Sequence, residues 1–134
     1  MKKTIFLSAV AVIGLLIGFS FTSCSDDANV LVGSWYKEER GNSNTGAPVV
    51  SYDIWLFKSD GTGTHRSYRE SSDKGVWFDD IRPYFYTIIS DQGDHGVVRI
   101  SYTDNNKSAD YIYSIVSNTL TLGDNVYRKG SPLN

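Results

Sequence analysis

The chain has 134 residues, of which 13 are basic and 15 are acidic, so its formal net charge is −2. A weakly acidic chain lacks the positive field through which proteins attract nucleic acids, so we expect no nucleic-acid partner. The single cysteine, Cys24, excludes a disulfide within the chain.

Residues 1–23 have the layout of an export signal. Lys2 and Lys3 are followed by an apolar run over residues 5–21 and then by small residues. A retained membrane helix is the competing interpretation, because about 20 apolar residues can span a bilayer. The short run and the lack of a basic flank after it favour a signal peptide.

The sequence Phe-Thr-Ser-Cys at residues 21–24 resembles a bacterial lipobox, with Phe21 in place of the usual Leu. Residues 25–27, Ser-Asp-Asp, resemble the signal that exports lipoproteins of the Bacteroidota to the cell surface. The resemblance implies that Cys24 is lipidated and anchors the protein to the outer membrane at the cell surface. Several acyl chains, each contributing about 0.8 kcal/mol per buried methylene, make such an anchor stable.

We expect residues 24–30 to be the lipidated cysteine and a tether, and residues 31–134 to form one domain. A domain of this length buries roughly two thirds of its unfolded surface without disulfides. Runs rich in Val, Ile, Tyr, Phe, Trp and Thr alternate with turn residues, which is typical of strands and tight turns. The predicted strands are residues 32–39, 49–58, 62–70, 75–79, 84–90, 97–103, 109–117, 119–122 and 125–129.

The connections between these strands are too short for parallel crossovers, so the sequence predicts an all-β antiparallel meander. Residues 79–83, Asp-Asp-Ile-Arg-Pro, are one of the predicted connections. Such a meander removes its edges by closing into a barrel or by packing as two sheets. We expect closure into a small barrel of about eight strands, which side chains fill or which holds one small ligand.

Three short motifs resemble lipocalins and the small lipocalin-like lipoproteins of the Bacteroidota. They are Gly-x-Trp at Gly33 and Trp35, the hairpin at residues 56–64, and the closing strands at residues 113–129. The resemblance implies a lipocalin-like barrel that binds a small, partly apolar molecule. It also implies that Trp35 packs under Arg128 and closes the barrel, a structural role in which a guanidinium over an indole contributes about 0.5–2 kcal/mol.

Aromatic residues supply the candidates for a ligand site. Alternation along a strand places Tyr84 and Tyr86 on the same face of one predicted strand, and Tyr111 and Tyr113 on the same face of another strand. If these faces point inward, they form an amphipathic pocket in which arginines orient a polar head group. If they point outward, they are cross-strand pairs that support the sheet. The candidate ligand-binding residues are Tyr84, Tyr86, Tyr111, Tyr113, Arg66 and Arg99.

We expect no enzyme activity, no cofactor and no metal site. The chain has no Gly-x-Ser-x-Gly nucleophile elbow, and the Gly-Thr-Gly at residues 61–63 lacks the lysine of a phosphate loop. Asp91, Asp94 and His95, completed by His65, have suitable ligand atoms. Their spacing matches no metal motif, and hairpin turns use Asp and Gly for backbone reasons.

Two functions from different classes therefore remain. The first is a lipocalin-like binder with an internal void. The second is a surface module that contacts a glycan or a protein through exposed aromatic residues, such as those in residues 76–80. The second predicts a filled barrel with Trp77 or Trp55 exposed.

Overall fold

The computed structural model describes residues 29–133. The predicted signal peptide, Cys24 and most of the predicted tether lie outside these residues. From Leu31 onward the chain forms one compact unit with its own hydrophobic core. Within residues 29–133 no helix is long and apolar enough to cross a bilayer.

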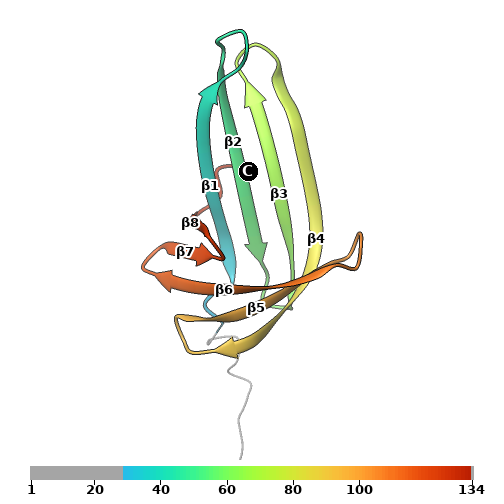
Figure 1. Ribbon diagram of the computed structural model, residues 1–134, viewed down its shortest axis with the longest axis vertical. Helices are drawn as coiled ribbons and strands as arrows, with labels where there is room; N and C mark the ends of the chain where they lie inside the picture. The colour runs from blue at the N-terminus through green and yellow to red at the C-terminus, as the bar shows by residue number, and fades with distance from the viewer. Residues whose placement is uncertain (1–28, 134) are drawn as a thin grey trace, which may run out of the picture. The chain divides into compact units, whose positions relative to one another are not determined.

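The described residues form eight antiparallel strands that close into a barrel in the order β1 to β8 (Figure 1). This confirms the predicted all-β meander and its closure. The strands are β1 (Gly33–Asn42), β2 (Pro48–Phe57), β3 (Thr62–Ser71), β4 (Gly75–Asp91), β5 (His95–Tyr102), β6 (Ser108–Val116), β7 (Thr119–Leu122) and β8 (Asn125–Lys129).

The structure contains one long strand where the sequence predicts two. β4 runs without a break through residues 79–83, so the prediction of a connection there was wrong. Pro83 is compatible with this strand because its carbonyl accepts a hydrogen bond from the backbone nitrogen of Thr103, on the side away from β3. The proline nitrogen points to that same side, so no hydrogen bond to β3 is lost.

Turn chemistry fixes the short connections. The two-residue turn between β7 and β8 begins with Gly123, whose φ of 61° suits the first central position of a hairpin turn. At the turn between β2 and β3, the carboxylate of Asp60 accepts hydrogen bonds from the backbone nitrogen and the hydroxyl of Thr62. Both turns hold their strands in antiparallel register.

Aromatic side chains fill the barrel interior. Phe57 packs edge-on against Tyr84 and Tyr86, with ring centroids 5.6 and 5.1 Å apart. The hydroxyls of Tyr84 and Tyr86 donate to the backbone carbonyls of Leu56 and Lys58, both at 2.5 Å. The buried core cluster comprises Leu31, Trp35, Trp55, Phe57, Tyr84, Tyr86, Val98, Ile100, Tyr113, Leu120, Leu122 and Tyr127.

Barrel closure differs from the expected pairing of Trp35 with Arg128, which was wrong. Lys129 is the residue opposite Trp35 in the β1–β8 register, and its Nζ lies 4.9 Å from the centroid of the Trp35 ring. Arg128 is opposite Tyr36 and lies over that ring on the outer face instead. Residues directly opposite each other on antiparallel strands lie on the same face of the sheet, and consecutive residues lie on opposite faces. Lys129 is therefore on the same face as Trp35, and Arg128 is on the other.

Gly33 has a steric role in this closure. A Cβ at Gly33 would lie 3.1 Å from the Nζ of Lys129, and the φ of +134° at this position favours glycine. The indole nitrogen of Trp35 donates to the carbonyl of Leu31 at 2.9 Å. The Gly-x-Trp motif therefore leaves room for the cation above the indole.

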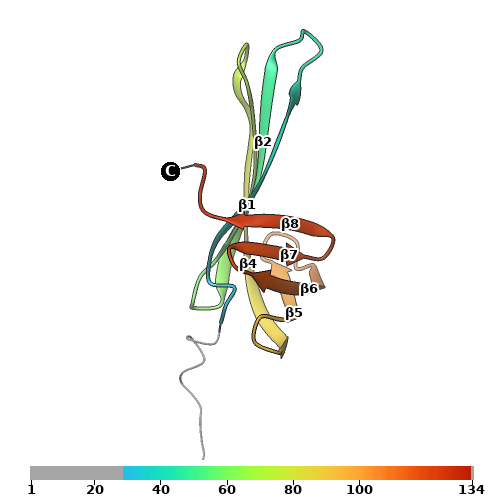
Figure 2. The same cartoon turned by 90° about the vertical axis from the view of Figure 1, so that its left-hand side faces the viewer.

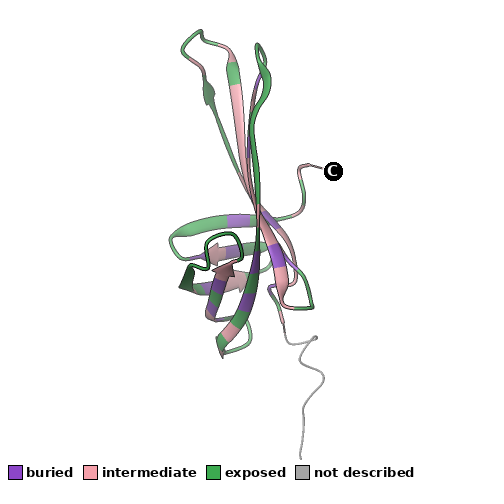
Figure 3. Cartoon of the chain, turned by 90° about the vertical axis from the view of Figure 1, so that its right-hand side faces the viewer, coloured by how far each residue is buried: buried purple, intermediate pink, exposed green. Residues whose placement is uncertain are grey.

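The first four strands extend beyond the barrel as an open sheet, which we define as residues 37–42, 48–53, 66–71 and 75–82. β1 pairs with β8 only at Trp35 and Tyr36, and β4 pairs with β5 only from Tyr84 onward. Figures 1 and 2 show β1–β4 continuing past the short strands that close the barrel. Most of the open sheet is exposed or half-buried, whereas the buried positions concentrate in the barrel (Figure 3).

Candidate functional site

The tyrosines predicted to bind a ligand belong to the core. Tyr84, Tyr86 and Tyr113 are buried, and Tyr111 packs partly buried against them. Burial raises the pKa of Tyr84 and of Tyr113 above the usual value for a phenol. The tyrosine faces thus point inward, where they pack against one another.

The two predicted arginines lie elsewhere. Arg66 forms a two-point ion pair with Asp79, at 2.9 and 2.8 Å, across β3 and β4. Arg99 pairs in the same way with Asp110, at 2.8 and 3.2 Å, across β5 and β6. Arg66 is next to His65, the residue opposite the core residue Trp55. Arg99 lies between the core residues Val98 and Ile100. Alternation along a strand therefore points both arginines away from the barrel interior. The structure brings the tyrosines together but leaves both arginines apart from them.

The two histidines occupy different environments. His65 stacks on Trp55, with ring centroids 3.8 Å apart and planes 8° from parallel. His95 is the exposed first residue of β5, and its Nδ1 lies 2.8 Å from the carboxylate of Asp94. Among residues 29–133, no three His, Cys, Asp or Glu side chains are placed to hold a metal ion together.

A polar cluster, which we call the mouth cluster, lies where the barrel meets the open sheet. It consists of Asp53, His65, Tyr102 and Tyr127. The carboxylate of Asp53 lies 2.5 Å from the Nε2 of His65 and accepts a hydrogen bond from the hydroxyl of Tyr127 at 2.9 Å. The Nδ1 of His65 lies 2.9 Å from the hydroxyl of Tyr102. The polar side-chain groups of the mouth cluster therefore form hydrogen bonds with one another.

The pKa shifts of the mouth cluster reflect its partial burial and the hydrogen bonds among its members. Burial acts to raise the pKa of Asp53, but hydrogen bonds from His65 and Tyr127, together with the charges of His65 and Lys37, bring it below its usual value. Burial also raises the pKa of Tyr127, and raises that of Tyr102 to about 12. Sequence analysis missed Asp53, although a lone carboxylate inside an apolar strand indicates a buried partner.

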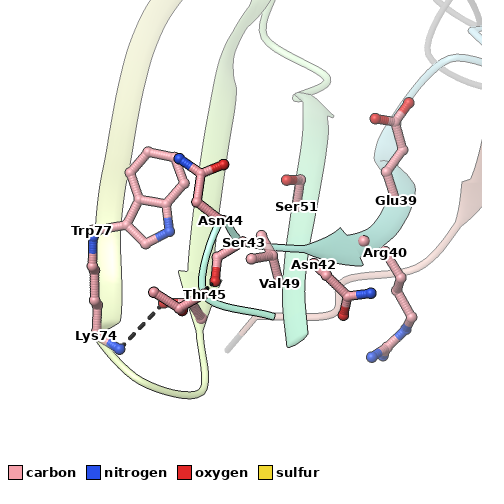
Figure 4. A pocket seen from close by; sticks show the side chains of 12 residues that line it. Glu39, Arg40, Asn42, Ser43, Asn44, Thr45, Val49, Ser51, Lys74 and Trp77 are labelled. Carbon is pink, nitrogen blue, oxygen red and sulfur yellow. Dashed lines mark hydrogen bonds between the residues drawn. The ribbon is translucent and has the colours of Figure 1, made fainter. Parts of the chain in front are cut away.

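A groove of about 560 Å³ lies over the face of the open sheet that continues the barrel interior. We call it the sheet groove. Its floor consists of short side chains on β1–β3, among them Val49, Ser51 and Ser71. Figure 4 shows Glu39 and Trp77 on opposite sides of this floor, with Asn44 beside the indole.

A second hollow of about 200 Å³ extends the sheet groove toward the barrel. The two hollows share Glu39 and Ser51, and the second also includes Asp53 of the mouth cluster. None of the residues that line them belongs to the core cluster of the barrel. The two hollows thus lie next to each other on the inner face of the open sheet, and the second reaches Asp53 of the mouth cluster.

A β-bulge positions Trp77 at this groove. The register between β3 and β4 shifts between Arg69 and Glu70, so that Trp77 is an extra residue between Val76 and Phe78. The side chain of Trp77 is 50% exposed, and the guanidinium of Arg69 lies 5.8 Å from its ring centroid. Bulges re-aim side chains in this way, and no local sequence pattern marks this one.

No family model, curated protein or solved structure matches this chain. The likeness to lipocalins therefore depends on the short sequence motifs and on the closed eight-stranded antiparallel barrel with its aromatic core. These features define a lipocalin-like architecture and leave the ligand open.

Proposed function

We propose that the protein is a lipid-anchored binding module of the outer cell surface, in which the barrel is the support and the sheet groove holds the ligand. The resemblance of residues 21–24 to a lipobox supports the anchor at Cys24, and the acidic residues after it support surface exposure. The observation that carries the proposed role is the contrast between a barrel interior packed with aromatic side chains and an open groove above it.

A ligand inside the barrel would have to displace part of this packing. Tyr84 is 1% exposed and its hydroxyl is already bonded to the carbonyl of Leu56, so neither its ring nor its hydroxyl is available. Removing the contacts of one large buried aromatic residue costs about 3–5 kcal/mol. A ligand in the sheet groove would displace no packed core side chain, because the walls of the groove are exposed to solvent. We therefore favour the surface module over the internal binder.

Binding to the cell envelope tests the role of the groove. The soluble domain, residues 25–134, is incubated with washed envelopes of its source organism, and the bound fraction is measured by sedimentation. Ser51→Trp places a large side chain on the groove floor, and we expect it to lower the bound fraction at least tenfold. Thr87→Trp is the matched control because Thr87 is exposed on the outer wall of the barrel.

Equal binding by both variants and by the unmodified domain would overturn the proposed role. A small molecule that co-purifies, is released only on unfolding and is retained by Ser51→Trp would instead place the ligand in the barrel. The anchor is tested separately with Cys24→Ala in the full chain. We expect this variant to lose acyl-chain incorporation and to leave the membrane fraction, and a chain that stays acylated would refute the assignment of Cys24.

A further inference from the structure

The walls of the sheet groove combine one flat aromatic surface with uncharged hydrogen-bonding groups. Trp77 contributes the aromatic surface, and its half-exposed ring is the one tryptophan of the described residues that reaches solvent to this extent. Trp35 and Trp55 are 1% and 4% exposed. The stacking of Arg69 against Trp77 holds the indole from one side, which limits the entropy lost when a ligand contacts it.

Polar groups near Trp77 are free to bind. The side chains of Asn44 and Ser51 line the groove and have no hydrogen-bond partner among residues 29–133. The loop that carries Asn44 is held in shape by a hydrogen bond between Ser43 and Thr45, at 2.9 Å. Thr45 in turn bonds to the carboxylate of Asp73 at 3.0 Å, which ties the loop across to the β3–β4 turn.

Charge at the groove is mixed and partly neutralised. Arg40 is paired with Glu38 at 2.5 Å, and Lys37 lies 3.8 Å from Glu39. Lys74 also lines the groove, and Asp73 is its neighbour in the chain, so this cation too has a carboxylate nearby. With acidic and basic groups interspersed, no strong field of one sign selects a polyanion or a polycation. An uncharged ligand with many hydroxyls, by contrast, meets donors and acceptors on the floor and a flat apolar surface on one wall.

From these features we infer that the sheet groove binds an uncharged carbohydrate chain, with one sugar ring stacked on Trp77 and its hydroxyls bonded to Asn44 and Ser51. A pyranose ring matches this arrangement because its C–H groups form an apolar face and its hydroxyls lie around the edge. The two adjoining hollows, which together reach from the loop of Asn44 to Asp53, offer room for more than one sugar unit. The inference rests on the proposed function, since it names the ligand class of the same groove.

Affinity electrophoresis in native gels tests this inference. The soluble domain is run through gels that contain a neutral β-glucan, a mannan, a xylan or the neutral polysaccharide fraction of the source organism, with albumin as the migration standard. We expect at least one of these neutral polymers to retard the domain, and Trp77→Ala to weaken the interaction at least tenfold. Trp77→Phe retains a ring and is expected to keep part of the binding.

Phe85→Ala is the matched control, because Phe85 is an aromatic residue that is 58% exposed on β4 but points outward from the barrel. We expect it to bind as the unmodified domain does. No retardation by any of the four polymers, or equal retardation of Trp77→Ala and Phe85→Ala, would overturn the inference. Circular dichroism of each variant checks that the fold is intact.

The envelope-binding experiment separates the two proposals. In one outcome, Ser51→Trp abolishes binding, protease treatment of the envelopes destroys it and periodate oxidation leaves it intact. This outcome would reject a carbohydrate and keep the groove as the binding site. Binding that Ser51→Trp leaves unchanged would reject the groove itself. Binding that periodate destroys and protease leaves intact supports both.

Discussion

Lys129 lies with its Nζ 4.9 Å from the ring centroid of Trp35, and this pair closes the barrel between its first and last strands. The neighbouring cation, Arg128, lies over Tyr36 on the opposite face, 5.8 Å from that ring centroid. Each arrangement follows from register, because residue pairs across antiparallel strands alternate between the two faces.

The closure predicts unequal costs for removing the two cations. Lys129→Ala removes the ammonium over Trp35 together with the apolar stem that covers the indole, so we expect a loss of about 1 kcal/mol in the free energy of unfolding. Arg128→Ala is expected to cost about half as much, since its guanidinium is more distant from a half-buried ring. Urea denaturation measures both. A larger loss for Arg128→Ala would contradict the observed pairing.

Gly63 lies where the barrel has no room for even the methyl side chain of alanine. A Cβ at this position would lie 2.5 Å from the hydroxyl and ring of Tyr84, and closer still to the carbonyl of Leu56. Overpacking of this kind costs typically 1–3 kcal/mol, so Gly63→Ala should lower the midpoint of thermal unfolding by several degrees.

Gly41 offers the control for this substitution. It lies in β1 within the open sheet, and a Cβ there meets nothing within 4 Å. We expect Gly41→Ala to change stability by less than about 0.5 kcal/mol. Equal effects of the two substitutions would show that Gly63 does not contact Tyr84 as described.

The strands and turns could be predicted from the sequence because they depend on local patterns. Runs rich in β-branched and aromatic residues mark the strands, and turn residues such as Gly123 mark the hairpins, so seven of the eight strands agree with the prediction to within a few residues. Closure of the meander follows from the need to remove exposed edges. Local patterns thus determine most of the fold.

The candidate site could not be predicted because it depends on long-range register. The sheet groove exists because β1–β4 are longer than the strands that close the barrel, and because a bulge turns Trp77 toward the inner face. The pairing of Asp53 with His65 depends on the diagonal contact between β2 and β3. The sequence names these residues, but only the strand register shows that they meet.

Tyrosine ionisation predicts loss of stability at high pH. The buried phenols have pKa values raised above the ordinary value of about 10, and that of Tyr102 is raised to about 12. The folded state therefore favours their neutral form, so their contribution is fully present below pH 10 and is lost as pH rises toward the folded pKa values. Burial is the main cause for Tyr84, Tyr102, Tyr113 and Tyr127. The pKa of Tyr68 is also raised, chiefly by the hydrogen bond of its hydroxyl to the carboxylate of Glu70.

Absorbance at 295 nm during alkaline titration measures this effect. We expect Tyr84, Tyr102, Tyr113 and Tyr127 to ionise only together with unfolding, as followed by circular dichroism. Tyr102→Phe should remove one of the late-titrating groups and flatten the loss of stability above pH 10. Ionisation of all nine tyrosines near pH 10, with the fold intact, would contradict the burial described here.

Asp53 predicts the behaviour at low pH. Its pKa lies below the unfolded value of about 3.9, because hydrogen bonds from His65 and Tyr127 outweigh the opposing effect of burial. A depressed pKa stabilises the fold above the unfolded pKa, and this contribution is lost as pH falls through the folded pKa. Asp53→Asn should therefore be less stable than the unmodified domain at pH 6, and the difference should shrink as pH falls from about 4 toward 2.

Urea denaturation at a series of pH values measures this difference. Asp124→Asn is the control, because Asp124 is exposed in the turn between β7 and β8 and has no side-chain hydrogen bond among the described residues. Its stability difference from the unmodified domain should stay small at every pH. If the loss in the free energy of unfolding caused by Asp53→Asn stays constant from pH 6 to pH 2, the negative charge of Asp53 does not stabilise the mouth cluster. The loss would then come from altered packing alone.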